Sequence, residues 1–403
     1  MKVAIVHPMM TWYRIPLFQL LGKRLPDLTV LFIRPDQLPT YSPKQSTPTR
    51  TAIEGVTFKL LRSIPLLPPP YPERTSLRVI LDIIRSRYNV VVWGASIVNV
   101  EALFSFTALK LLRRRIVIWI DEWGWRKPLL RRLYDPVARL ILRHADACIA
   151  HGVRHKRYYL SLGIPEEKIF LSGSVSLARR SPDTRWLARK ILNELGWSGK
   201  KVILYVGGLI ERKGVHYLIK AFKKVLEKHG DARLLIVGQG PRENSLKQLC
   251  RRLKVDEYVR FMGWVDNQNI SPYYHLCDVF VLPSVTIVGA SWNYEEAGAE
   301  PWGLVLNEAM SMGKPVIATT AVGAAEDLIV NGANGFVVRE RDTLALSRAI
   351  ETILADEELR KRMGTYSAEI VRRRFTYKHM ADAFVRAIQY AQRKKDSHEV
   401  CDG

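Results

Sequence analysis

The sequence predicts an α/β protein with two doubly wound, Rossmann-like domains, and two observations support this fold class. Short apolar runs typical of buried parallel strands alternate along the chain with segments of helical spacing. The 403 residues are also enough for two domains that each bury a core. A stretch from residue 172 to 186 has linker composition. We therefore predict a first domain, 1–175, a linker, 176–199, and a second domain, 200–375.

The first domain opens with a short apolar run, KVAIV at 2–6, which predicts a strand. A loop leads into a helical segment at 15–25, and a second strand is expected at 28–33. The next stretch, 37–72, is rich in Pro, Thr and Ser and ends in consecutive prolines, which cannot donate the hydrogen bonds of a sheet. We predict a long loop there, with a polyproline kink.

Continuous apolar runs at 89–93 and 115–120 predict buried strands on either side of a helix at 101–112. A basic helical segment, 126–143, follows Trp123 and Trp125. Pro128 suits the first turn of this helix, whereas Pro136 is expected to kink it. The domain then continues with two short strands and an intervening helix, at 147–150, 168–171 and 154–162.

The second domain repeats the alternation of strands and helices. A strand at 202–206 runs into a glycine loop, GGLIERKG, and then into a helix at 216–228. Three further strands are expected, at 233–237, 258–261 and 279–282, and a final helix at 376–393. The glycine loop therefore lies at the carboxyl end of a strand, where open parallel sheets bind their ligands.

Composition limits the class of protein. With 47% hydrophobic and 25% charged residues the chain should be globular. Its longest apolar stretch, 90–109, contains Asn99 and Glu101, so no membrane-spanning segment is expected. The N-terminus resembles a first strand more than a signal peptide, which favours a cytoplasmic protein. Four cysteines lack metal-ligand spacing and are expected to be free thiols, with no metal required: Cys148, Cys250, Cys277 and Cys401.

The net charge of +23 is concentrated in the first domain. Residues 1–180 contain 29 Lys and Arg against 12 Asp and Glu, or +17, which leaves 33 against 27, or +6, for the rest. A field of this size attracts nucleic acid, anionic membrane or acidic small molecules, and composition does not choose among them.

The most informative stretch of the chain runs from residue 300 to 335. Glu300 and Glu308 are separated by seven residues, and the apolar spacing after Gly303 predicts a helix at 304–312, followed by a strand at 316–318. The unpaired N–H groups of Gly303, Leu304 and Val305 at the start of this helix favour an anion such as a diphosphate. The pattern predicts a phosphorylated ligand flanked by carboxylates.

The string E-x7-E, followed by EAMSMGKPVIAT and NGANGFVV, resembles the C-terminal half of the retaining, nucleotide-sugar-dependent glycosyltransferases of family 4. The resemblance is clear over about residues 200–385. It implies the GT-B fold, in which two domains face each other across a cleft, with a last helix, 376–395, packing back on the first domain. It also implies that Glu300 faces the donor sugar and that Glu308 holds the ribose hydroxyls.

The glycine loop supplies the second part of the predicted site. Backbone at Gly207 and Gly208 could approach phosphate oxygens, and a cation at Arg212 or Lys213 would offset the charge of the diphosphate. Lys213 matches the family lysine. The family arginine after the first glycine is replaced by Gly208, so Arg212 is the candidate substitute. Gly238, in GQGP, resembles another turn of the family, although a structural turn is the simpler interpretation.

In the first domain the resemblance places a sugar-facing histidine after the strand at 115–120, where this chain has Asp121 and Glu122. Either carboxylate could contact the donor sugar or the acceptor hydroxyl, or could cap the next helix. The loop after the first strand lacks the family glycine pair and offers Tyr13 and Arg14 instead. We do not predict a phosphate role for that loop.

The resemblance implies a retaining glycosyltransferase that uses a UDP- or GDP-linked sugar, and the missing metal-ligand spacing predicts that it needs no metal ion or other cofactor. The expected acceptor is a glycan or a polyprenyl- or lipid-linked sugar, in cell-envelope polysaccharide or glycolipid synthesis. The basic segment with Arg131, Arg132 and Arg139 suggests peripheral binding to anionic lipid at the inner face of the membrane, with no nucleic-acid partner. The alternatives are a nucleotide-sugar epimerase of similar fold, an inactive scaffold, and a basic nucleic-acid-binding protein.

Overall fold

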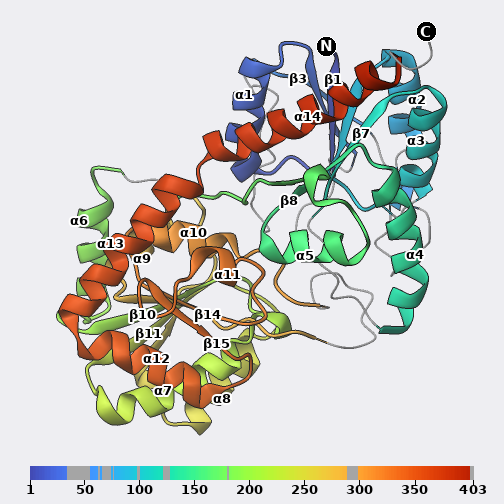
Figure 1. Cartoon of the computed structure of the whole chain (residues 1–403). Coiled ribbons are helices and arrows are strands. Elements are labelled where there is room, and N and C mark those ends of the chain that lie inside the picture. The colour runs from blue at the N-terminus through green and yellow to red at the C-terminus, as the bar shows by residue number, and fades with distance from the viewer. Residues whose placement is uncertain are drawn as a thin grey trace. The chain divides into compact units, whose positions relative to one another are not determined.

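The computed structural model describes residues 1–33, 55–61, 64–65, 74–75, 77–97, 100–120, 128–178, 181–287 and 298–399. The chain divides into two compact units, each built around its own sheet (Figure 1). Unit 1 contains Met1–Ser174 and Thr376–Gly403, and unit 2 contains Val175–Phe375. Asp121, Glu122 and the two tryptophans that follow them lie outside the described residues.

Unit 1 has a parallel sheet of seven strands in the order β3-β2-β1-β6-β7-β8-β9. Its central strand, β6, is apolar along its whole length and fully buried, as expected where helices cover both faces of a doubly wound sheet. The strands are β1 (Val3–His7), β2 (Leu28–Phe32), β3 (Thr57–Leu60), β6 (Val90–Trp93), β7 (Arg115–Trp119), β8 (Ala147–Ala150) and β9 (Ile169–Leu171).

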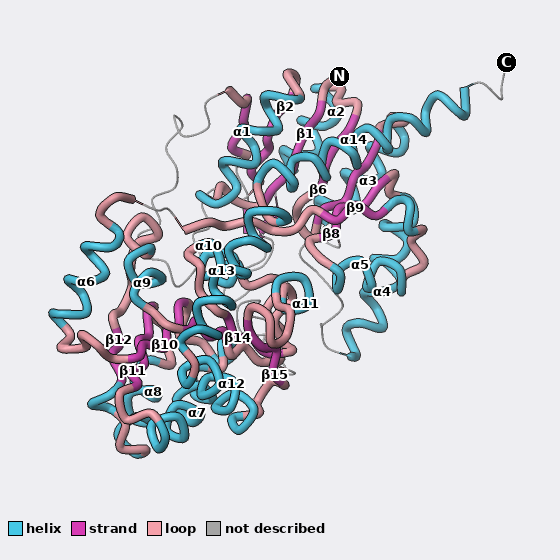
Figure 2. Tube along the Cα trace, turned by 60° about the vertical axis from the view of Figure 1, so that its left-hand side comes forward, coloured by secondary structure: helices cyan, strands magenta, loops and turns pink. Residues whose placement is uncertain are grey.

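The helices of unit 1 are α1 (Ile15–Arg24), α2 (Leu77–Ser86), α3 (Val100–Leu111), α4 (Pro128–His144), α5 (Val153–Ser161) and α14 (Tyr377–Glu399). The last of these, α14, packs against α1 and against β7, β8 and β9 (Figures 1 and 2). It buries Met380, Phe384 and Ile388, whose spacing of four residues puts them on one helical face. As predicted, α4 begins at Pro128; it continues through Pro136.

Two expectations for unit 1 need correction. The predicted loop 37–72 contains a strand, β3, which pairs in parallel with β2 and places Phe58 against Phe32 with ring centroids 6.4 Å apart. A short antiparallel pair, Ile64–Pro65 with Arg74–Thr75, begins in the same stretch. The many prolines on both sides of β3 led to the prediction of a loop, although two of the residues of β3 itself, Thr57 and Phe58, favour a strand. Helix α2 had no counterpart in the prediction.

Unit 2 has a parallel sheet of six strands in the order β12-β11-β10-β13-β14-β15. The strands are β10 (Lys201–Val206), β11 (Ala232–Val237), β12 (Val259–Phe261), β13 (Val279–Leu282), β14 (Val316–Thr319) and β15 (Gly335–Val338). The longer helices are α6 (Thr184–Glu194), α7 (Val215–Lys228), α8 (Glu243–Arg252), α10 (Leu304–Ser311), α12 (Thr343–Ala355) and α13 (Glu357–Arg374). Two short helices complete the unit, α9 (Ser271–Leu276) and α11 (Ala325–Leu328).

Helix α6 corrects the predicted linker at 176–199. Thr184 and Ala188 are buried, and Ile191 and Leu195 pack beside the core of unit 2. Their spacing of four, three and four residues is that of one helical face. The Ser, Arg and Pro residues just before the helix dominated the composition of the stretch and hid this signal.

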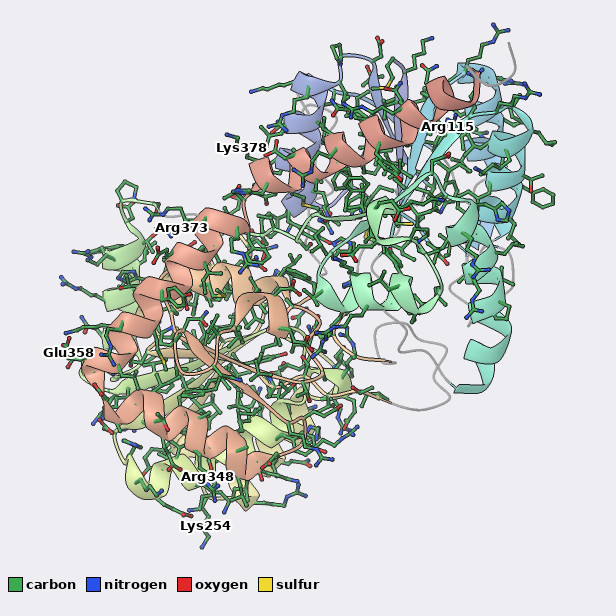
Figure 3. The ribbon with its side chains drawn as sticks, viewed as in Figure 1. Arg115, Lys254, Arg348, Glu358, Arg373 and Lys378 are labelled. Atoms are coloured by element: carbon green, nitrogen blue, oxygen red, sulfur yellow. The ribbon has the colours of Figure 1, made fainter. Side chains whose placement is uncertain are left out.

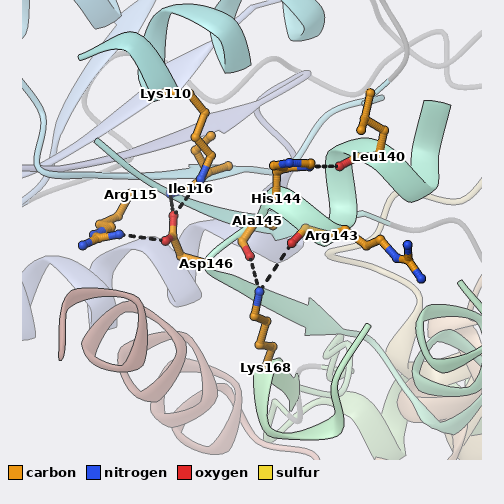
Figure 4. A network of polar contacts seen from close by, with 9 residues as sticks. All are labelled: Lys110, Arg115, Ile116, Leu140, Arg143, His144, Ala145, Asp146 and Lys168. Atoms are coloured by element: carbon orange, nitrogen blue, oxygen red, sulfur yellow. Dashed lines mark hydrogen bonds and ion pairs between the residues drawn. The ribbon is translucent and has the colours of Figure 1, made fainter. Parts of the chain in front are cut away.

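Polar networks away from the carboxyl ends of the strands have a structural role. Asp146 accepts a hydrogen bond of 2.8 Å from the backbone N–H of Ile116 and one of 3.1 Å from Arg115, while Lys168 donates to the carbonyls of Arg143 and Ala145 (Figure 4). These contacts join the amino ends of β7 and β8 and satisfy carbonyls at the end of α4. They lie at the opposite edge of the sheet from the usual ligand site.

Many basic and acidic side chains lie at the surface, some of them in exposed ion pairs. Lys254, Arg348, Glu358 and Arg373 project away from the ribbon of unit 2 in Figure 3, and all four are exposed. In the part of the chain that the structure describes, no helix is long and apolar enough to cross a membrane. The free thiols of Cys148, Cys250 and Cys277 are buried, and burial raises the pKa of each to about 12, which disfavours the nucleophilic thiolate.

Candidate functional site

The candidate site lies where the connections of the unit 2 sheet change direction. β10 pairs with β11 on one side and with β13 on the other. After β10 the chain adds β11 and β12 on one side of it, and then β13, β14 and β15 on the other side. The loops that follow neighbouring parallel strands diverge at such a point and leave a crevice at their carboxyl ends. The predicted phosphate loop follows β10, and Ser284 follows β13.

Glycines let these loops approach each other closely. A Cβ at Gly238 would lie 1.9 Å from the carbonyl oxygen of Gly207, and one at Gly214 would lie 2.1 Å from that of Pro283. Gly214 also has a left-handed φ of +64°, which glycine adopts without strain. Gly208 is different, because a Cβ there would meet only the carbonyl oxygen of Gln239, at 4.0 Å. Position 208 therefore has room for a side chain.

Glu300 is buried between the two predicted cations. Its Oε2 lies 2.5 Å from Nζ of Lys213 and 3.0 Å from a terminal nitrogen of Arg212, and it accepts a hydrogen bond of 3.3 Å from the Ser284 hydroxyl. Its backbone is fixed by hydrogen bonds to Ala321 and Gly323, in the loop after β14. The structure thus brings together three of the predicted residues and adds Ser284, which the sequence analysis did not single out.

The charges of this cluster are strongly coupled. Burial alone would raise the pKa of Glu300, but the nearby charges of Lys213 and Arg212 lower that pKa to about 2. Burial lowers the pKa of Lys213, an effect that Glu300 opposes. Burial, and then the charge of Glu300, raises the pKa of Tyr205 well above 10, so this side chain stays neutral and donates to the carbonyl oxygen of Gly208 at 2.9 Å. Glu300 is therefore ionised, an acceptor of hydrogen bonds and not an acid.

Glu308 lies on α10, and this helix starts at the candidate site. Gly303 precedes it with a φ of +99°, and the N–H groups at the first turn, including those of Leu304 and Val305, have no partner within the helix. Glu308 accepts hydrogen bonds from Ser176 at 2.5 Å and from Tyr274 at 2.6 Å. Burial raises the pKa of Glu308, and these two hydrogen bonds oppose the rise.

Sequence reasoning missed both partners of Glu308, because a hydrogen bond over 132 or 34 residues leaves no local pattern. Each carboxylate oxygen has a second lone pair, so Glu308 can still accept from a further donor. Asp121 and Glu122 cannot be placed, since they lie outside the described residues. No group of three potential metal ligands occurs among the residues that were searched, which are the described ones.

The family model for glycosyl transferases group 1 matches residues 188–370, which include this cluster. The chain is 31% identical over 192 residues to an uncharacterized glycosyltransferase of Methanocaldococcus jannaschii, covering 48% of this chain and 45% of the relative. It is 28% identical over 248 residues to the alpha-D-kanosaminyltransferase of Streptomyces kanamyceticus, covering 60% and 61%. A phosphatidyl-myo-inositol mannosyltransferase of Mycobacterium leprae is 33% identical over 174 residues, covering 43% and 42%. The chain thus spans about half the length of the curated relatives it matches.

Solved structures resemble the whole fold. HepE of Anabaena in complex with UDP has a TM-score of 0.75 and 18% identity, covering 96% of this chain and 100% of that one. WaaG, a glycosyltransferase involved in lipopolysaccharide biosynthesis, has a TM-score of 0.67 and 16% identity, covering 94% and 98%. With the two parallel sheets described above, these likenesses confirm the predicted α/β fold class.

Proposed function

We propose that this chain is a retaining glycosyltransferase of family 4, which moves a sugar from a UDP- or GDP-linked donor to a glycan or lipid-linked acceptor. The observation that carries the proposal is the buried cluster of Glu300, Arg212 and Lys213 at the switch point of the unit 2 sheet. Two cations beside the start of a helix suit a diphosphate leaving group. The match to glycosyl transferases group 1 over residues 188–370 supports the same conclusion.

In the proposed reaction the bond between the sugar C1 and the diphosphate oxygen breaks, and the acceptor oxygen forms a bond to C1 on the same face. The departing diphosphate takes the proton of the acceptor hydroxyl. Lys213 and Arg212 would stabilise the negative charge that develops on the phosphate oxygens, as would the N–H groups at the start of α10. The chain's contribution is thus positioning and electrostatic stabilisation.

Glu300 has two tasks in this proposal, one for each carboxylate oxygen. Its Oε2 holds Arg212, Lys213 and Ser284, while no described residue donates to its Oε1. With a pKa near 2 the carboxylate stays ionised, so Oε1 can accept a hydrogen bond from a sugar hydroxyl. Glu308 would accept from the ribose hydroxyls through its remaining lone pairs. The reaction as written uses no metal ion.

A lipid-linked acceptor is favoured by the surface of unit 1. Helix α3 exposes Phe104 at 60% and Leu111 at 80%, and α4 exposes Leu140 at 61% beside Arg139 and Arg143. Exposed apolar side chains with arginines suit a helix at the surface of an anionic bilayer. One relative acts, by its name, on phosphatidyl-myo-inositol. We propose peripheral binding at the inner face of the membrane, with cell-envelope glycolipid or polysaccharide synthesis as the setting.

The test of the activity is transfer itself. Purified chain should release UDP or GDP from one nucleotide sugar faster when a lipid-linked glycan extract is added, and NMR of the product should show the anomeric configuration of the donor. An inverted product would contradict the retaining mechanism. Conversion of the nucleotide sugar without any acceptor would favour the nucleotide-sugar epimerase. Salt-dependent binding of nucleic acid, with no binding of nucleotide sugar, would favour the basic nucleic-acid-binding protein.

A further inference from the structure

Arg14 in unit 1 is a buried cation with no counter-ion among the residues that the structure describes. It is 4% exposed, at the end of a short 3-10 helix, Trp12–Arg14, that leads from β1 into α1. Its Nε has no acceptor among the described residues, and these residues form no ion pair with it. The only hydrogen bond from its guanidinium to a described residue goes to the sulfur of Met380, at 3.7 Å. A buried charge left in this state is costly unless a partner is supplied.

Other unsatisfied donors lie next to Arg14. Trp119, at the end of β7, faces the guanidinium at 4.8 Å from its ring centroid, and its indole Nε1 is buried without an acceptor in the described part of the chain. The buried hydroxyl of Thr11, three residues before Arg14, also has no described partner. A guanidinium and an indole N–H can only donate, so this set calls for a ligand rich in acceptor oxygens.

The position in the sheet is also that of a ligand site. β1 pairs with β2 on one side and β6 on the other, so the switch point of the unit 1 sheet lies between β1 and β6. Arg14 follows β1, and Gly94 follows β6. A Cβ at Gly94 would lie 2.8 Å from the Trp119 ring, so this glycine makes room for the tryptophan. The rings of His7 and His151 also lie near that ring, with centroid distances of 5.4 and 5.7 Å.

We propose that unit 1 has its own oxyanion site, in which Arg14, Thr11 and Trp119 bind a phosphate group. This revises the sequence-based view of the loop after β1, because the side chain of Arg14 supplies the charge where no glycine pair exists. The site does not depend on the transferase proposal or on the cluster in unit 2. The phosphate could belong to a phosphorylated acceptor or to the diphosphate of a nucleotide.

The experiment is calorimetric titration of the full chain with inorganic phosphate in phosphate-free buffer. It is done in the Lys213→Ala background, so that binding at the unit 2 cluster is suppressed. Phosphate should bind this protein, and Arg14→Met should weaken binding by about tenfold or more, the usual effect of losing a charge-assisted contact. The control is Arg24→Met, which removes a partly exposed arginine at the end of the following helix, α1, that pairs with Asp382. Equal phosphate affinity in the Arg14 and Arg24 variants would overturn the proposal.

A second measurement separates a ligand site from a structural arginine. Without phosphate, Arg14→Met should have a melting temperature equal to or above that of the parent, because it removes an uncompensated buried charge. A clear fall would mean that Arg14 is paired within the protein, for example with Asp121 or Glu122, and would contradict the proposal. Thr11→Val removes one donor with little change in shape, and Trp119→Phe removes the indole N–H together with part of the ring. Each should weaken phosphate binding severalfold, and the melting temperature of the Trp119 variant controls for the lost packing.

The source of the phosphate follows from competition in the same protein. If geranyl phosphate displaces inorganic phosphate and UDP does not, the site serves a phosphorylated acceptor. If UDP or GDP displaces it and geranyl phosphate does not, the site serves the nucleotide. Both results require binding that depends on Arg14, and each assigns the site to one substrate.

Discussion

The two sheets place basic side chains at the same topological position, but among the described residues only unit 2 supplies a carboxylate that neutralises their charge. In unit 2, Arg212 and Lys213 share the carboxylate of Glu300, which is ionised because they surround it. In unit 1, Arg14 lies beside aromatic rings, and no described carboxylate pairs with it. If both proposed sites bind their ligands, unit 2 holds its cations ready with an internal counter-ion, whereas in unit 1 the ligand itself would supply the counter-charge of Arg14.

The largest difference between the units should appear in stability. Glu300→Gln leaves two buried cations without their partner and should lower the free energy of unfolding at pH 7 by about 3–5 kcal/mol. Arg14→Met should lower it hardly at all. Denaturant unfolding measures both, with Glu358→Gln as an exposed control that should change stability by less than about 0.5 kcal/mol. If Glu300→Gln is as stable as the wild type, the cluster is not coupled as described.

The destabilising effect of Glu300→Gln should become smaller at acid pH. The pKa of Glu300 is about 2 in the folded protein, against 4.5 for an ordinary glutamate in the unfolded chain. Ionisation of Glu300 therefore stabilises the folded protein, fully so above pH 4.5. That contribution, about 3 kcal/mol from the shift in pKa, is lost as the pH falls from 4.5 to 2. The difference in stability between wild type and Glu300→Gln should shrink over this range. A constant difference would assign the effect of the mutation to packing.

The next effect concerns turnover. Lys213→Ala and Arg212→Ala should each lower kcat by about 10²-fold, since each removes one charge contact to the leaving phosphate. Steady-state kinetics with the donor in excess measures this. Because position 208 has room for a side chain, Gly208→Arg should restore part of the activity of Arg212→Ala. Full activity of Arg212→Ala alone would show that this residue does not replace the family arginine.

A smaller effect is expected at the proposed ribose contact. Glu308→Ala should weaken nucleotide binding by about 1.5–3 kcal/mol, which is roughly 10- to 150-fold in Kd. Tyr274→Phe removes only the hydroxyl that donates to Glu308 and is the matched comparison. It should change Kd much less, because the carboxylate remains. Calorimetry that finds the same nucleotide affinity in Glu308→Ala and wild type would rule out the ribose contact.

The smallest effect per residue is expected for membrane binding, because each Lys or Arg near an anionic bilayer contributes about 1 kcal/mol to the binding free energy. Flotation with anionic liposomes should be strong at low salt and weaker at high salt, because the Debye length falls to about 3 Å at 1 M. Replacing Arg131, Arg132 and Arg139 by Glu should reduce it further, whereas Arg348→Glu, on unit 2, should not. If flotation changes neither with salt nor with replacement of these arginines, the charge of unit 1 does not serve membrane binding, and a soluble acidic acceptor becomes the better candidate.

The sequence predicted those features that depend on local pattern. Buried parallel strands such as β10 appear as continuous apolar runs, and the predicted strand 202–206 differs from β10 by one residue. Strand β3 was missed because its residues are only partly buried at the edge of the sheet and follow a stretch rich in proline. For the site, the spacing of Glu300 and Glu308 was visible. The pairing of Glu300 with Lys213 was not, because the two residues are 87 positions apart and meet only in the folded sheet.

The most direct test of the central claim is nucleotide binding at the unit 2 cluster. Thermal denaturation of the wild type should be shifted upward by UDP or GDP, since a ligand at a hundred times its Kd stabilises by about 2.7 kcal/mol. The shift should be lost or much reduced in Lys213→Ala and Glu308→Ala, and unchanged in Lys254→Ala, an exposed lysine of the same unit. An equal shift in all four proteins, or none with either nucleotide or its sugar conjugates, would contradict the assignment of the donor site.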